Sequence, residues 1–140
     1  EEIKTLKKWV EQGGRLLIIA DHMPFSGATN TLANAFGFDF CDGFAQLSKP
    51  ENTPDLFSEE NKRLLTSKIT DGTYGKPLQS VTTFTGSSFQ IPENAIGILK
   101  FRKGDVCLQP DIAWQFDDNT PSKDLEDNYQ GAIKNFGKGN

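Results

Sequence analysis

The stretch at residues 13–24, which reads GGRLLIIADHMP, constrains the fold most strongly. Two glycines precede an apolar run, and the run stops at Asp21 and His22. An apolar run without alternation is typical of a strand that is covered on both faces, hence parallel and central in its sheet. We therefore predict a buried strand at residues 15–20 with Asp21 and His22 at its carboxyl edge, where open α/β sheets bind ligands.

A helix is expected before this strand. Residues 1–12 place Ile3, Leu6, Trp9 and Val10 on one helical face, and the glycine pair supplies a left-handed cap. A helix, a glycine turn and a buried strand make half of a βαβ unit. Because a crossover helix normally follows a strand, we expect the fold to have its first strand upstream and a last strand after the closing GKGN turn.

A second helix is predicted at residues 29–36, closed by a glycine and preceded by a loop of small residues that includes Ser26. Its first turn would face Asp21 and His22 and offer free N–H groups to an anion. Ordinary capping by small polar residues is the favoured interpretation. Further predictions are a short strand at residues 38–44 with a turn at 42–43, a loop at 49–57, a helix from about 58 to 67, and a loop at 70–77.

The second half of the chain is richer in strands. Residues 79–84 are β-branched and predict a strand that ends at a polar cluster, Thr85, Gly86, Ser87 and Ser88. The segments 95–102 and 105–109 are separated by Lys-Gly, which predicts a β-hairpin. Residues 111–116 either pair with that hairpin or pack Trp114 over the sheet.

The composition excludes some partners. A net charge of −4 and a pI near 5.0 leave no basic stripe for nucleic acid, and no run of eighteen apolar residues could span a membrane. No signal peptide is visible, so cytoplasmic and exported locations both stay open. Cys41 and Cys107 match no zinc or redox spacing and are either two buried thiols or, in an exported protein, one disulfide.

Few side chains could carry chemistry. His22 is the only histidine, so a metal would need His22 with carboxylates such as Asp21 and Asp42, and a structural role for the pair is favoured over a metal site. Ser26, Ser87 or Ser88 with His22 would supply the residue types of a triad. No GxSxG elbow is present, however, and thiols within apolar strands are usually inert.

Three segments together suggest a family: LKKWVEQGGRLLIIADHMP, NTLANAFGFDFCDGFA and QGAIKNFGKGN. They resemble class I glutamine amidotransferase-like domains of an uncharacterised type, which are flavodoxin-like α/β sandwiches. In active members the strand after the glycine pair leads to a nucleophilic Cys that is served by a downstream His and Glu. Here the strand end reads Ala20, Asp21, His22, and no later His exists, so the resemblance implies the fold without the catalytic Cys.

We therefore expect residues 1–140 to form one amidotransferase-like domain: a three-layer, flavodoxin-like α/β sandwich with a mainly parallel central sheet and a β-hairpin extension at residues 95–109. The expected function is non-catalytic binding of a small ligand or a protein partner at the carboxyl edge of the sheet, without metal or cofactor. The expected site residues are Asp21, His22, Ser26, Thr85, Gly86 and Ser87. The alternative is a metal-assisted or Ser-based hydrolase in which His22 is a ligand or general base and Asp21 orients it, so enzymatic activity stays open.

Overall fold

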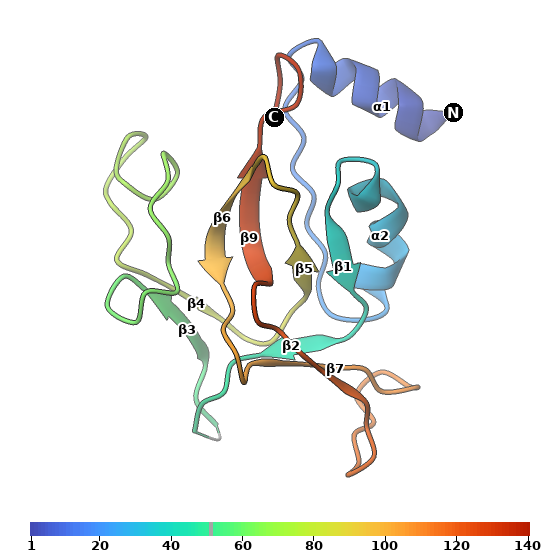
Figure 1. Cartoon of the computed structure of the whole chain (residues 1–140), viewed down its shortest axis with the longest axis vertical. Helices are drawn as coiled ribbons and strands as arrows, with labels where there is room; N and C mark the ends of the chain where they lie inside the picture. Colours follow the sequence, from blue (N-terminus) through green and yellow to red (C-terminus); the bar gives the residue numbers. More distant parts are fainter. Residues whose placement is uncertain (51) are drawn as a thin grey trace.

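The computed structural model describes residues 1–50 and 52–140 (Figure 1). These residues form two helices, α1 (Glu2–Glu11) and α2 (Phe25–Asn34), and nine short strands. The strands are β1 (Asp39–Cys41), β2 (Phe44–Gln46), β3 (Asp55–Ser58), β4 (Ser80–Thr83), β5 (Ser88–Gln90), β6 (Ala95–Lys100), β7 (Val106–Leu108), β8 (Ser122–Asp124) and β9 (Tyr129–Lys134). They make three sheets, with orders β1-β5-β9-β6, β2-β7-β8 and β3-β4.

The predicted flavodoxin-like sandwich is wrong, because every strand pairing among the described residues is antiparallel. Parallel sheets need a crossover helix between successive strands. Among the described residues both helices precede β1, and the nine strands follow without a described helix between them (Figure 1). The alternation of helices and strands that a three-layer sandwich requires is therefore missing.

The predicted central strand at residues 15–20 is also wrong. The segment is extended but belongs to no sheet, and Leu17 and Ile19 are each 81% exposed, whereas Leu16 and Ile18 are half-buried. An apolar run does not reveal how many of its faces are covered. Here Leu16 and Ile18 line a cavity together with residues of the four-stranded sheet, so the segment lies across this sheet rather than within it.

The first helix forms where the apolar spacing predicts it. Val10 is its buried residue, and Gly13, with φ of 115°, turns the chain into the extended segment. The turn at the other end of the chain packs here, because Lys138 donates its main-chain N–H to the carbonyl of Glu11 at 2.9 Å. A side chain at Gly139 would overlap the carbonyl of Val10, so this close approach requires glycine. The GKGN turn, predicted to lead into a strand, thus covers the end of α1.

Three of the other local predictions differ from the structure. Helix α2 begins at Phe25, four residues before the predicted start. The predicted helix at residues 58–67 is absent, because Ser58 and Asn61 each hydrogen-bond the other's main-chain N–H with their side chains and close a turn there. Such local side-chain bonds compete with helix formation. Asp55–Ser58 instead form β3, inside the predicted 49–57 loop, and pair with β4, which confirms the predicted strand at 79–84.

The predicted hairpin at residues 95–109 is wrong as well. Strand β6 pairs with β9, whereas β7 pairs with β2 and β8. Gly97 allows β9 to come close to β6, since a Cβ at this position would overlap the ring of Tyr129. The Lys-Gly turn between β6 and β7 therefore sends the two strands into different sheets.

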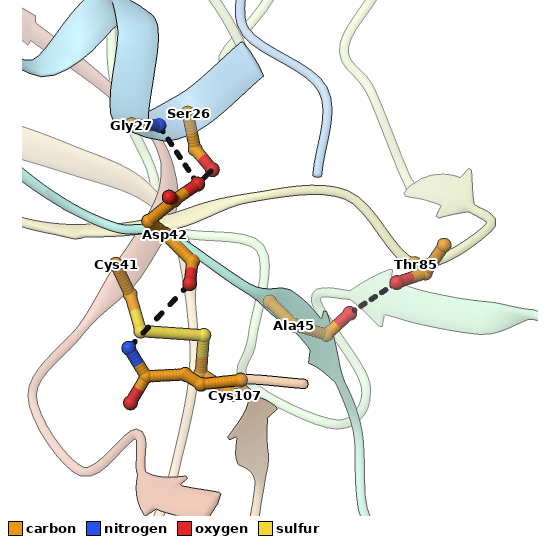
Figure 2. Close-up of a disulfide and its surroundings, with 8 residues drawn as sticks. Ser26, Gly27, Cys41, Asp42, Ala45, Thr85 and Cys107 are labelled. Carbon is orange, nitrogen blue, oxygen red and sulfur yellow. Dashed lines mark hydrogen bonds between the residues drawn. A yellow bond between two sulfur atoms is a disulfide. The ribbon is translucent and has the colours of Figure 1, made fainter. Parts of the chain in front are cut away.

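The core lies where the three sheets meet. Its buried members are Cys41, Ala45, Leu47, Phe57, Phe101, Cys107 and Leu125. Phe57 and Phe101 meet edge to face with centroids 5.6 Å apart, and burial of each Phe side chain contributes about 2 kcal/mol. Cys41 of β1 and Cys107 of β7 form a disulfide, so of the two states that the sequence allowed the structure has the bonded one (Figure 2).

Two buried carboxylates connect the loops around this core. Asp105 accepts hydrogen bonds from the main-chain N–H groups of Ser48, at 2.9 Å, and Arg102, at 2.6 Å, and it forms a bidentate ion pair with Arg63. Asp55 accepts from the N–H groups of Leu47 and Thr85 at 3.0 and 3.1 Å, and it forms an ion pair with Lys49 at 2.9 Å. A buried charge is tolerated only when it is paired and hydrogen-bonded, which both groups are.

Candidate functional site

The predicted site residues do come together, around the corner between β1 and β2. Met23 donates its N–H to the carbonyl of Gly43 at 3.0 Å, which holds residues 20–26 against this corner. From the other side, Ser87 Oγ donates to the carbonyl of Ala20 at 2.8 Å, and the N–H of Ala45 donates to the carbonyl of Gly86 at 2.9 Å. These bonds bring the two predicted clusters to one corner of the molecule, whereas the sequence placed them at the edge of a parallel sheet.

The imidazole of His22 is packed between aromatic rings. It stacks on Phe44, with centroids 4.3 Å apart and an interplanar angle of 16°, and Trp114 meets it edge-on at 4.5 Å. Its Nδ1 lies 2.7 Å from the carbonyl of Met23, which can only accept, so Nδ1 carries the hydrogen. The side chain is 12% exposed. This packing is what a structural histidine requires.

Asp21 lies beside His22 without orienting its ring closely. The side chain is 62% exposed, and its Oδ1 accepts the main-chain N–H of His22 at 2.8 Å. The distance from Oδ2 to Nε2 is 3.8 Å, which is too long for a hydrogen bond. Asp21 therefore stabilises the local turn and does not hydrogen-bond the imidazole.

The start of α2 is already occupied by a carboxylate of the same chain. Ser26 is buried and donates its hydroxyl to Asp42 Oδ1 at 2.9 Å, and Gly27 donates its main-chain N–H to the same oxygen at 2.9 Å (Figure 2). A Cβ at Gly27 would overlap the Asp42 carboxylate. The helix N-terminus favours negative charge, and Asp42 supplies it. The predicted anion site is thus filled from within.

The polar cluster at residues 85–88, after β4, also makes hydrogen bonds within the chain. Thr85 has φ of 49° and donates its hydroxyl to the carbonyl of Ala45 at 3.0 Å (Figure 2). Gly86 has φ of 119°, a left-handed conformation that glycine tolerates, and Ser87 is buried. The one buried side-chain hydroxyl without a partner among residues 1–50 and 52–140 belongs to Ser88, one residue further on.

The described residues offer neither a metal centre nor a triad. No group of three His, Cys, Asp or Glu side chains among them is close enough to hold a metal ion. Within the same residues, the hydroxyls of Ser26 and Ser87 donate to Asp42 and Ala20, and neither is hydrogen-bonded to His22. The hydroxyl of Ser88 is not hydrogen-bonded to His22 either, so none of the three predicted serines bonds the imidazole in this structure.

A cavity that the sequence did not reveal lies between the helices, the extended segment and the four-stranded sheet. Its volume is about 360 Å³, within the range of small-molecule sites. Its apolar lining includes Leu16, Ile18, Phe36, Phe38, Phe40, Phe89, Ile133 and Phe136. Since these residues come from four separate segments, no local motif could have signalled the cavity.

The cavity lining contains two cations, Arg15 and Lys134. Lys134 Nζ donates to the carbonyl of Phe36 at 2.8 Å and lies 5.6 Å from the ring centroid of Phe136. Among the described residues, no carboxylate lies within ion-pair distance of either cation. The lining is thus mainly apolar and carries positive charge that is not neutralised inside the protein.

The chain matches no protein-family model, and comparison with curated proteins and with solved structures finds no match either. The resemblance to amidotransferase-like domains therefore stays a prediction from the three quoted segments. In the described part of the chain, neither helix is long and apolar enough to cross a membrane.

Proposed function

We propose that the protein is a non-catalytic module that binds a small molecule with an apolar body and an anionic head. The observation that carries this proposal is the apolar cavity of about 360 Å³ beneath residues 15–18. At the rim around Asp21 and His22, where the sequence predicted the ligand, the hydroxyls of Ser26 and Ser87 and Nδ1 of His22 already bond within the chain. The cavity is therefore the better supported site.

The chemistry of the lining supports this ligand class. Aromatic and branched side chains favour an apolar body, and transfer of apolar surface from water contributes about 25 cal/mol per Å². Lys134 has an ammonium group with three hydrogens, and the carbonyl of Phe36 accepts one of them. A carboxylate head placed beside Lys134 would accept another in a charge-assisted hydrogen bond.

The hydrolase alternative receives less support. A general base needs its imidazole within reach of the proton that it removes. The His22 ring is stacked on Phe44, and its Nδ1 bonds the carbonyl of Met23. These contacts favour a packing role for His22 over the role of a general base.

The test uses decanoate as the probe and isothermal titration calorimetry as the measurement. We expect the wild type to bind decanoate, and Ala132→Leu, which adds bulk to the cavity lining, to lose most of that binding. Ala28→Leu is the matched control, because Ala28 is exposed on α2 outside the cavity. The proposal fails if the wild type does not bind decanoate, or if the two leucine variants bind it equally while both retain the wild-type circular dichroism.

The role of the cation is tested separately with Lys134→Gln. This variant is expected to weaken decanoate binding by about tenfold and to leave binding of uncharged decanol unchanged, since only the charged head bonds the ammonium group. Lys123→Gln, an exposed lysine on β8, is the control and should bind both probes as the wild type does. An equal loss for both probes would assign Lys134 a packing role only.

A further inference from the structure

The extended segment at residues 15–21 presents a main-chain edge that is largely unpaired. Among the described residues, it makes two bonds to distant parts of the chain: the N–H of Leu16 donates to the carbonyl of Asn140 at 2.8 Å, and the carbonyl of Ala20 accepts from Ser87 Oγ. The N–H and C=O groups of Leu17 and Ile19 have no partner among these residues. Unpaired main-chain groups on an extended chain are a template for another strand.

The bonds of Leu16 and Ala20 indicate which edge of the segment lacks hydrogen-bond partners. In an extended chain the N–H and C=O of one residue point to the same side, and those of the next residue point to the opposite side. Leu16 and Ala20 both bond inward, to residues of their own chain. The main-chain groups of the odd-numbered residues, Arg15, Leu17, Ile19 and Asp21, therefore share the outward edge.

The side chains of these same four residues are exposed. Residues 15–21 alternate strictly between exposed and half-buried, with the period of two that an extended chain has. The exposed row reads Arg, Leu, Ile, Asp, with Leu17 and Ile19 each 81% exposed. It thus carries a positive charge at one end, a negative charge at the other, and two apolar side chains between them.

This row is complementary to itself when it is turned end to end. In an antiparallel pair centred on Ile18, Arg15 lies opposite Asp21 of the second copy, and Leu17 lies opposite Ile19. The two-fold axis repeats both pairs, which gives two ion pairs and two apolar pairs of the kind that stabilise cross-strand contacts. Parallel pairing in register would instead place like charges opposite each other, and a shift of two residues would place Arg15 opposite Ile19.

We propose that two copies of this chain associate through antiparallel pairing of residues 15–21, centred on Ile18. We choose a second copy as the occupant of the open edge because antiparallel pairing places Arg15 of each copy opposite Asp21 of the other. The pairing satisfies the outward N–H and C=O groups and removes Leu17 and Ile19 from water. This inference is independent of the cavity and of any ligand.

The test is sedimentation velocity of the full chain over a range of concentrations. The wild type is expected to dimerise as its concentration rises. Arg15→Asp gives each copy two acidic ends, and Asp21→Arg gives each copy two basic ends, so each variant alone should remain monomeric. An equimolar mixture of the two variants should form a heterodimer, because acidic ends then meet basic ends in both pairs.

Glu59→Arg is the matched control, since Glu59 is exposed and directly follows β3, whose sheet is not the four-stranded sheet beneath residues 15–21. It should dimerise like the wild type. The proposal is overturned if the wild type is monomeric throughout, if the single variants dimerise as the wild type does, or if the mixed variants stay monomeric. Decanoate binding by the wild type and by Asp21→Arg reports the cavity separately, because Asp21 lies outside the cavity lining whereas Arg15 belongs to it. Failure of one proposal is therefore distinguishable from failure of the other.

Discussion

The imidazole of His22 lies nearly parallel to the ring of Phe44, with centroids 4.3 Å apart and planes inclined by 16°. The only histidine of the chain is thus part of an aromatic group that also contains Trp114 and Phe116. Phe44 is buried in this group, so the stack connects residues 20–26 to strand β2. His22 therefore helps to hold residues 20–26 against strand β2.

Replacement of His22 is therefore expected to affect stability. His22→Ala should lower the free energy of unfolding by about 1–2 kcal/mol, because it removes the stack on Phe44 and the bond to the carbonyl of Met23. His22→Phe keeps an aromatic ring and should recover at least half of that loss. Urea denaturation measures both, and equal losses for the two variants would mean that the ring stack contributes nothing.

The buried ion pair between Arg63 and Asp105 should be sensitive to the loss of either partner. Asp105→Asn and Arg63→Met are each expected to cost about 3 kcal/mol, because the remaining charge would be buried without its partner. Lys100→Met is the comparison, since Lys100 and Asp127 form an exposed ion pair that should contribute less than about 1 kcal/mol. Denaturant unfolding separates the two cases, and similar costs for buried and exposed pairs would contradict this account.

The disulfide between Cys41 and Cys107 is expected to stabilise the fold substantially. It closes a separation of 66 residues, for which chain entropy in the unfolded state predicts about 4 kcal/mol. Reduction, or Cys41→Ser with Cys107→Ser, should lower the unfolding midpoint accordingly. Mass spectrometry after alkylation without reductant is the check on the bond itself, and two alkylated cysteines would rule it out.

The carboxylate of Asp124 is expected to make the free energy of unfolding depend weakly on pH. The main-chain N–H of Gly104 donates to its carboxylate, and with that of Glu126 it lowers the pKa of Asp124 below the usual 3.8. Because the pKa is lower in the folded state, the carboxylate stabilises the fold at pH values above its unfolded-state pKa. This stabilisation is lost as the pH falls through the folded-state pKa. Asp124→Asn should therefore be slightly less stable than the wild type at about pH 7, and equal to it at about pH 2.

The control for this effect is Asp118→Asn, because the Asp118 side chain makes no hydrogen bond to any described residue. Its unfolding midpoint should equal that of the wild type at both pH values. An NMR titration of the Asp124 carboxyl carbon reports the pKa directly, and a value at or above 3.8 would remove the basis of the prediction.

Local patterns in the sequence predicted several elements correctly. The spacing of Ile3, Leu6 and Val10 predicted α1, and the β-branched run at 79–84 predicted β4. Of the two possibilities for residues 111–116, packing of Trp114 is observed, since its ring contacts Phe44 and His22. Each of these depends on neighbours in sequence or on a single close contact.

The sequence by itself determined that residues 16–20 are apolar, that residues 15–20 are extended, and that a glycine-closed helix precedes them. Only the tertiary structure decided that these residues lie across a sheet instead of inside it, that all strands pair antiparallel, and that β6 and β7 separate at Gly104. The physical reason is that hydrogen-bond partners and covered faces are set by contacts between distant residues. A side-chain pattern states which residues avoid water, but it does not state what covers them.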